Sequence, residues 1–302
     1  MNRSAPLLRI LAFRLSVFDP ERLRRFYVEG LGFEALAEGP IAASEMALLG
    51  LNRSGWRWTL AIDEERLDLD RFDVPGRPCS AESNAADLTF QHCAIVVTDA
   101  VAAYRRAVDH GAIAISARGP VKLPPSAGGV VAVKFRDPEG HPLEFLQFPT
   151  GAASRWSGAK PQVGPLGIDH SAISVADAEV SALFYGEHGL RRGVASVNQG
   201  RAQAALDGLA APRVDVVPLM PEDSGPHLEL LGYRVPRALR AHVLGVNDIA
   251  ATRIVWASDR DGMMRDRDGH LHELRLQDQA ACRQAASRPD RLRRITSSRS
   301  PS

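Results

Sequence analysis

Four acidic residues stand inside otherwise apolar segments of this 302-residue chain: Asp68, Glu144, Glu229 and Glu273. A carboxylate that is buried without a partner is costly, so each one needs a metal ion, a cation or a hydrogen-bond network. Two histidines have a matching position, because His92 lies seven residues before Asp99 and His170 seven residues before Asp177. Imidazole and carboxylate groups that meet at one point can bind a divalent metal.

These residues recur because the chain repeats a structural unit. Segments from Leu11, Phe90 and Ile168 each read as a strand that ends in Asp, followed by an amphipathic helix that Gly terminates. The helix N-caps are expected at Asp19, Asp99 and Asp177. The acid-bearing segments are the closing strands of four such modules.

Two of the expected elements can be specified further. The third helix is expected to bury Val180, Leu183 and Phe184. The fourth module opens with the strand that begins at Ala251 and reaches the turn RDRDGH without room for a helix, so it is truncated.

The turn RDRDGH matches the turn RDPEGH of the second module. Each turn ends in a histidine, His141 or His270, to which we assign a structural role in the hairpin.

Composition excludes several classes of protein. Hydrophobic residues make up 45% of the chain and charged residues 24%, as in a globular protein. The formal net charge of +1 gives no reason to expect nucleic-acid binding, and no apolar run reaches the roughly 18 residues of a membrane span. Three scattered cysteines do not form a disulfide framework or a thiolate metal site, so we expect a cytoplasmic protein.

The module resembles that of the vicinal oxygen chelate superfamily, which includes glyoxalase I, bleomycin resistance proteins and extradiol dioxygenases. The resemblance is carried by FYVEGLGF at Phe26, FYGEHGL at Phe184 and DPEGHPLEF at Asp137. It implies an α+β fold of paired βαβββ modules, in which the first and last strands supply metal ligands. We expect modules 1 and 2 to form one domain (8–149) and modules 3 and 4 a degenerate second one (167–277). A linker (150–166) would join them, and a disordered Arg/Ser-rich tail (278–302) would follow.

Carried over position by position, the resemblance implies two sets of candidate ligands. The first half presents Ala12, Asp68, His92 and Glu144, and the second half presents His170, Glu229, Arg253 and Glu273. Ala12 cannot bind a metal, and Arg253 would place a cation at the site. The first half is therefore the preferred site, with Glu144 as the catalytic base.

Each candidate also has a structural interpretation. His92 could be a hydrogen-bonded core residue, and Asp68 could face solvent at a sheet edge. Arg253 and Glu273 could form a buried ion pair that replaces the metal.

One imidazole and two carboxylates favour Mn, Ni, Co or Zn over Fe(II), whose oxygenases use two histidines and one carboxylate. The resemblance then implies a lactoylglutathione lyase-like enzyme, a lyase or isomerase that acts on a small oxygenated substrate through a metal-stabilised enediolate. An extradiol dioxygenase is an alternative, and so is a non-catalytic small-molecule binder of the bleomycin-resistance type. The substrate, the use of glutathione and the formation of a homodimer stay open.

Overall fold

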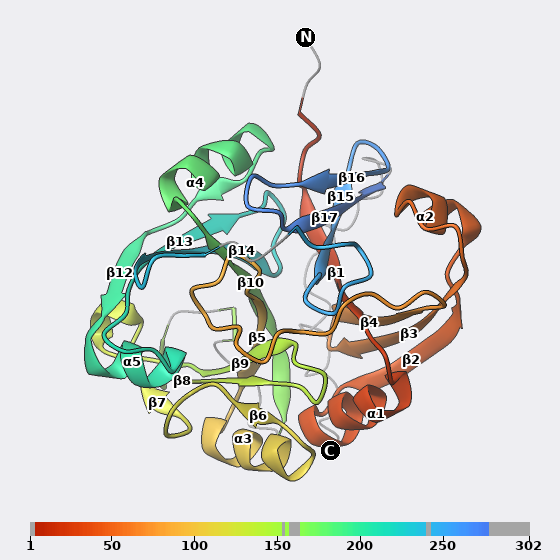
Figure 1. The fold of residues 1–302 in the computed structure, drawn as a ribbon. Helices are drawn as coiled ribbons and strands as arrows, with labels where there is room; N and C mark the ends of the chain where they lie inside the picture. Colours follow the sequence, from red (N-terminus) through yellow and green to blue (C-terminus); the bar gives the residue numbers. More distant parts are fainter. Residues whose placement is uncertain (1–3, 153–154, 157–163, 240–242, 278–302) are drawn as a thin grey trace, which may run out of the picture.

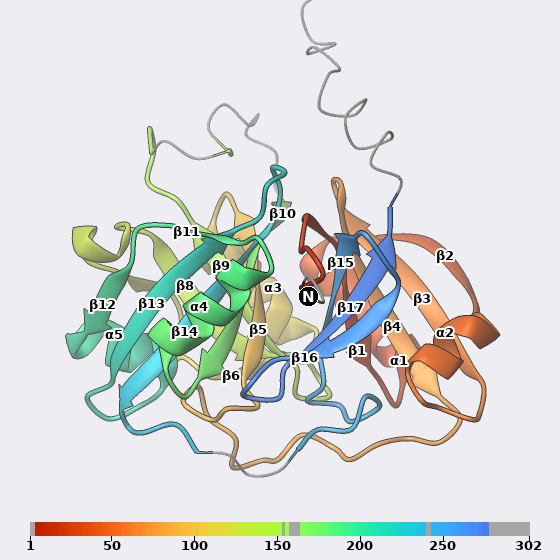
Figure 2. The ribbon, with the colours of Figure 1, turned by 90° about the horizontal axis from the view of Figure 1, so that it is seen from above.

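The computed structural model describes residues 4–152, 155–156, 164–239 and 243–277, and these form two β-sheets that lie side by side (Figures 1 and 2). The seven-stranded sheet contains, in spatial order, β16 (Gly262–Arg265), β17 (Leu271–Leu276), β15 (Arg253–Ser258), β1 (Arg9–Ser16), β4 (Glu65–Phe72), β3 (Gly55–Ile62) and β2 (Glu34–Pro40).

The ten-stranded sheet is larger. Its main path contains β11 (Arg191–Arg192), β13 (Arg213–Met220), β14 (His227–Val235), β10 (Pro165–Val175), β5 (Gln91–Val97), β9 (Pro142–Gln147), β8 (Val131–Arg136) and β6 (Ile113–Ala114). Off this path, β12 (Ser196–Gln199) pairs with β13, and β7 (Val121–Lys122) pairs with β8.

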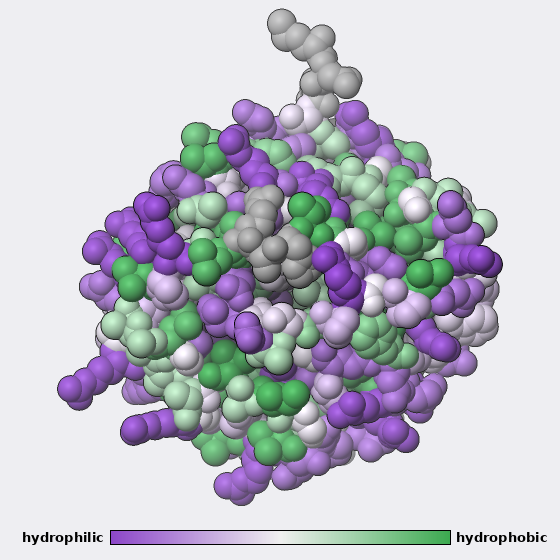
Figure 3. Space-filling model, in the orientation of Figure 1, coloured by the Kyte–Doolittle hydropathy of each residue, from purple (hydrophilic) through white to green (hydrophobic). Residues whose placement is uncertain are grey.

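The helices are short. They are α1 (Pro20–Arg25), the π-helix η1 (Phe26–Leu31), α2 (Ala43–Leu48), α3 (Ala100–Asp109), the 3-10 helix η2 (Pro125–Ala127), α4 (Ala178–Glu187) and α5 (Gly200–Asp207). None of these described helices is long and apolar enough to cross a membrane. On the face drawn in Figure 3, hydrophilic side chains surround small groups of hydrophobic ones.

The four expected modules are visible in the strand pairing. In each module the first strand pairs in parallel with the acid-bearing last strand, as β1 with β4, β5 with β9, β10 with β14 and β15 with β17. The opening strand of module 4 is β15, as expected, and the chain passes from it to β16 without a helix.

The pairing between modules differs from the expectation. The seven-stranded sheet joins modules 1 and 4 through β1 and β15, and the ten-stranded sheet joins modules 2 and 3 through β5 and β10. Each sheet therefore draws strands from both expected domains (8–149 and 167–277). The segment interpreted as an interdomain linker follows β9 and leads into β10, two strands of one sheet. The expected tail, 278–302, lies outside the described residues.

The main hydrophobic core joins the two sheets. It contains buried side chains of β1, β5 and β10 together with Tyr27 of η1, Ala107 of α3 and Tyr185 of α4. Burying a large apolar side chain contributes about 1.5–3 kcal/mol, so this shared core holds the sheets against each other.

The helices begin where the sequence predicts. The side chains of Asp19, Asp99 and Asp177 each accept hydrogen bonds from backbone N–H groups of the first helical turn. The predicted face of the third helix is wrong, because Leu183 is 74% exposed and Tyr185 is buried in its place.

The two turn histidines make structural contacts. Asp137 accepts a hydrogen bond from the hydroxyl of Tyr27 at 3.0 Å and lies 2.7 Å from Nδ1 of His141, whose Nε2 lies 3.0 Å from the carbonyl oxygen of Ser16. Module 2 is thus fastened to module 1 across the two sheets. In the same way, Tyr185 donates to Asp266, and His270 contacts the carbonyl of Ser174.

Candidate metal centre

Residue alternation in the ten-stranded sheet places two candidate ligands on one face. Cys93 of β5 belongs to the core between the sheets, so its neighbour His92 projects to the opposite face. Phe145 of β9 also belongs to that core, and Glu144 therefore projects to the same face as His92.

A β-bulge brings the second histidine to this face. The register between β10 and β5 shifts between Ile168 and His170, which leaves Asp169 as an extra residue. In a regular strand Ile168 and His170 would share a face. The bulge leaves Ile168 in the core and turns His170 towards His92.

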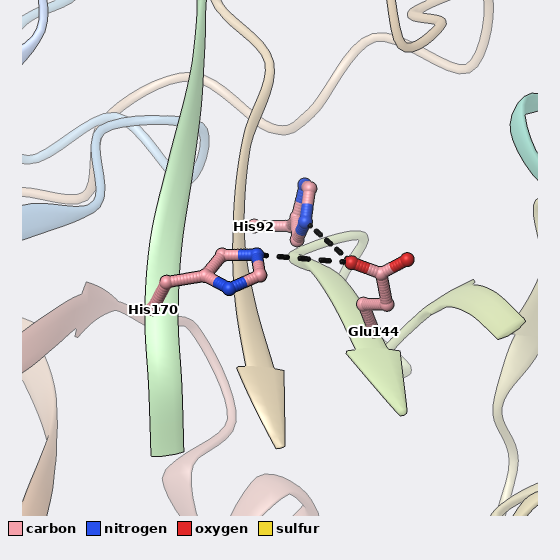
Figure 4. A group of neighbouring side chains, drawn as sticks. All are labelled: His92, Glu144 and His170. Carbon is pink, nitrogen blue, oxygen red and sulfur yellow. Dashed lines mark hydrogen bonds and ion pairs between the residues drawn. The ribbon is translucent and has the colours of Figure 1, made fainter. Parts of the chain in front are cut away.

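Four side chains from modules 2 and 3 converge on this face: His92, Glu144, His170 and Glu229. Figure 4 shows the first three. Nε2 of His92 lies 3.0 Å from Oε2 of Glu144. Nε2 of His170 lies 3.9 Å from the same oxygen and 3.6 Å from Oε2 of Glu229. Ligand atoms of His92, Glu144 and His170 all lie within 4.8 Å of one another, close enough to share one metal ion.

The environment of His170 fits a metal ligand. Oδ2 of Asp169 lies 3.0 Å from its Nδ1, which places the ring proton on Nδ1 and the lone pair on Nε2 in the neutral form. Among the described residues this buried Nε2 has no hydrogen-bond partner. A neutral imidazole with a free Nε2, a neighbouring carboxylate on Nδ1 and two acids in front of it suit a divalent cation.

Burial and the neighbouring carboxylates together set the charge of the two histidines. Burial opposes protonation of His170, but Glu229, Asp169 and Glu144 outweigh it and raise its pKa to about 9. For His92, burial is the larger effect and lowers the pKa to about 4. Without a metal, His170 therefore holds a proton and adds a positive charge beside these acids.

The pKa of Glu144 is lowered to about 2. Burial opposes this shift, but Lys134, His92 and His170 stabilise the carboxylate. Glu144 is thus an anion although only 5% of its surface is exposed.

The cluster lies at a cavity of about 360 Å³. Its walls include apolar side chains from both modules, namely Leu123, Val130, Leu146, Leu206, Val216 and Leu231. His227 also lines this cavity, and its ring centroid lies 5.2 Å from that of His170.

Two predicted ligands lie elsewhere. Asp68 and Glu273 belong to the seven-stranded sheet, so the set of Asp68, His92 and Glu144 expected from the first half does not assemble. The structure instead gathers His92 and Glu144 from the first half with His170 and Glu229 from the second. It supplies two imidazoles and two carboxylates where one imidazole was expected.

Arginines occupy the corresponding position of the seven-stranded sheet. Nε of Arg14 lies 3.0 Å from Oδ2 of Asp68, and its Nη1 lies 2.5 Å from Oε1 of Glu273 and 2.8 Å from Oε1 of Glu45. Asp68 is fully buried, so it does not face solvent either. Both acids at the ligand positions are thus paired with the Arg14 guanidinium.

The replacement of a metal by arginine was expected at Arg253. Its closest acidic partner is Asp70 at 2.7 Å, whereas Glu273 lies 4.0 Å away. An arginine side chain does stand in place of a metal, but it is Arg14 that pairs with both Asp68 and Glu273. The sequence contains a signal for this: Arg14 stands two residues after Ala12, on the same strand face.

The comparisons with known proteins agree with this fold. A family model described as Glyoxalase/Bleomycin resistance protein/Dioxygenase superfamily matches residues 9–145. Glyoxalase I from Zea mays is 15% identical with a TM-score of 0.53, and the alignment covers 90% of this chain and 92% of that chain. A putative dioxygenase from Bacillus subtilis subsp. subtilis str. 168 is 14% identical with a TM-score of 0.54, covering 90% and 86%. No curated protein matches the sequence.

Proposed function

Because residues 9–145 match the model of the Glyoxalase/Bleomycin resistance protein/Dioxygenase superfamily, we propose that the protein is a metal-dependent enzyme of the glyoxalase type. It would bind one divalent ion at His92, Glu144, His170 and Glu229 and act as a lyase or isomerase on a small oxygenated substrate. One observation carries the proposal: the buried Nε2 of His170, which has no hydrogen-bond partner in the described part of the chain, faces the acids Glu144 and Glu229.

The donor set narrows the choice of metal. Two imidazoles and two carboxylates suit Ni, Co, Zn or Mn. Six-coordinate ions would keep two positions for adjacent oxygens of a substrate. Such an ion supplies Lewis acidity, because it polarises a carbonyl oxygen and stabilises negative charge there.

Glu144 is the proposed base. Its carboxylate would take the proton from a hydroxyl-bearing carbon next to the substrate carbonyl and return it to the carbonyl carbon. One C–H bond would break and another would form, while the hydroxyl proton would pass to the former carbonyl oxygen. The apolar walls of the cavity would exclude water while Glu144 holds the proton.

Metal analysis tests the proposal. Protein purified in the presence of Ni²⁺ should contain close to one ion per chain, and His92→Ala, His170→Ala or Glu229→Ala should each lose most of it. His110→Ala is the matched control, because His110 is exposed at the end of α3. Metal-free wild-type protein from a metal-replete preparation would contradict the proposal.

A dioxygenase is the second candidate. The sequence argued against it because neither half contains two histidines at ligand positions, and the structure removes that argument by bringing His92 and His170 together. The second carboxylate still exceeds the two-histidine, one-carboxylate set of Fe(II) oxygenases. Oxygen uptake with catechols and Fe(II) would favour this candidate.

A non-catalytic binder is the third candidate. It would use the same cavity, and it predicts protection against thermal unfolding by a small molecule with no bound metal. The metal analysis therefore separates it from both enzymes.

A further inference from the structure

A buried lysine shares the face of the candidate metal centre. Lys134 of β8 lies directly opposite Glu144 of β9 in the strand register, so both side chains project to the same side of the sheet. The Lys134 side chain is only 4% exposed, and it lines the same cavity as His92 and Glu144.

A fixed carboxylate holds this lysine in place. Nζ of Lys134 donates a hydrogen bond to Oδ1 of Asp207 at 2.8 Å. The other oxygen of Asp207 accepts hydrogen bonds from Gln203 at 2.7 Å and from the hydroxyl of Tyr233 at 2.9 Å. Asp207 ends α5, so the pair joins this helix to β8.

The ammonium group has donors to spare. It carries three N–H groups, and among the described residues only Asp207 accepts one of them. Burial opposes its charge, but Asp207, Glu144 and Glu229 outweigh burial and raise the pKa of Lys134, so it stays a cation. A buried cation with unused donors is expensive unless another acceptor is supplied.

The charged side chains around the cavity indicate which kind of acceptor would satisfy the unused N–H groups of Lys134. A divalent ion would balance Glu144 and Glu229, while Asp207 balances Lys134. An anionic oxygen placed between the ion and the unused N–H groups would gain a charge-assisted hydrogen bond, which is about twice as strong as a neutral one. Six apolar side chains, Leu123, Val130, Leu146, Leu206, Val216 and Leu231, line part of the remaining wall, beside the polar Ser126, Ser196, Asn198 and Gln203. An apolar part of the ligand would pack against these six side chains.

We infer that Lys134 is a substrate-recognition residue that selects a small carboxylate with an oxygen on the adjacent carbon and an apolar remainder, such as a branched 2-oxo acid. This inference rests on the proposed function, because the neighbouring oxygen would bind at the metal centre.

Isothermal titration calorimetry on the Ni²⁺-loaded full-length protein tests it with two probes of one shape. One probe is 4-methyl-2-oxopentanoate, and the other is 5-methylhexane-2,3-dione, in which a methyl group replaces the carboxylate oxygen. Lys134→Met should weaken binding of the acid by about 10- to 100-fold and leave binding of the dione unchanged. Lys122→Met is the control for loss of a lysine, because Lys122 is exposed on β7.

A second variant guards against misfolding. Lys134→Met leaves Asp207 as an unbalanced buried charge, whereas Lys134→Met combined with Asp207→Asn removes both charges, and the same loss of acid binding is expected. The Ni²⁺ content of each variant is measured first.

The outcomes separate the two proposals. If wild-type protein takes up no Ni²⁺, the metal centre is wrong and this inference fails with it. Two results would overturn only the role of Lys134 while Ni²⁺ still binds. In the first, wild-type protein does not bind the acid. In the second, Lys134→Met and the double variant Lys134→Met with Asp207→Asn both keep the wild-type ratio of acid to dione affinity.

Discussion

His170 is the residue at which metal and proton compete. It is surrounded by Asp169, Glu144 and Glu229, and these carboxylates make it a base with a pKa of about 9. A metal can bind only the neutral imidazole, so metal binding must release this proton. Affinity for the metal and protonation of His170 are therefore opposed.

This opposition predicts a pH dependence. Between the ordinary pKa of 6.5 and the folded value of about 9, apparent Ni²⁺ affinity should rise by about tenfold per pH unit. The metal-free protein should show the reverse trend. A raised folded pKa contributes stability that is fully present below pH 6.5 and is lost as the pH rises through about 9. Thermal unfolding with EDTA and with Ni²⁺ across this range measures both, and parallel curves would contradict the prediction.

Arg14 gives a second prediction at this scale. Arg14→Met would remove the buried guanidinium that Asp68 and Glu273 share, while Arg66 still pairs with Asp68 and Arg275 with Glu273, so unfolding free energy should fall by about 1.5–3 kcal/mol. Urea unfolding measures the loss, and Ni²⁺ content should not change. Arg24→Met, which removes an exposed ion pair with Glu21, should cost about 1 kcal/mol or less. An equal effect of the two variants would argue against the interpretation.

At the scale of elements, the cross-sheet turns can be tested. Tyr27→Phe and Tyr185→Phe each remove a buried hydroxyl that donates to Asp137 or Asp266, and each should lower the free energy of unfolding by about 1–3 kcal/mol. Tyr104→Phe is the matched control, because no hydrogen bond of its hydroxyl is found among the described residues. Chemical denaturation measures all three, and equal stabilities would show that the turns do not fasten the sheets.

Single elements were largely predictable from the sequence because their signals are local. The Asp N-caps, the closing strands and the truncated fourth module follow from residues within one turn or one strand. The face of α4 was not predictable in this way. Leu183 is exposed because Tyr185, which reaches Asp266 of another module, is the residue that the fold buries.

The pairing of modules lies beyond local signals. Nothing in the composition of 150–166 tells whether this segment joins two sheets or two strands of one sheet, because that depends on contacts distant in sequence. The bulge at Asp169 could not be predicted from the sequence either, because it is defined by the register between β10 and β5. Lys134 stands in an apolar strand, but its position beside the candidate metal centre could not be predicted, because it depends on the strand register that places Lys134 opposite Glu144.

At the scale of the whole molecule, the two sheets should differ in metal content. The ten-stranded sheet offers two histidines and two acids, whereas Arg14 fills the corresponding position of the seven-stranded sheet. We therefore expect a ratio close to one metal ion per chain at saturation, measured by elemental analysis of dialysed protein. A ratio near two would mean that Asp68 and Glu273 release their arginine and bind metal.

The paired modules are nested along the sequence: modules 2 and 3, which share one sheet, lie between modules 1 and 4, which share the other. One continuous stretch of sequence, from β5 to β14, therefore encloses every proposed ligand. A substitution in module 1 or module 4, for example at Arg14, therefore falls in a stretch of sequence that holds no proposed ligand, so the architecture separates the chemistry of one sheet from changes made in the other.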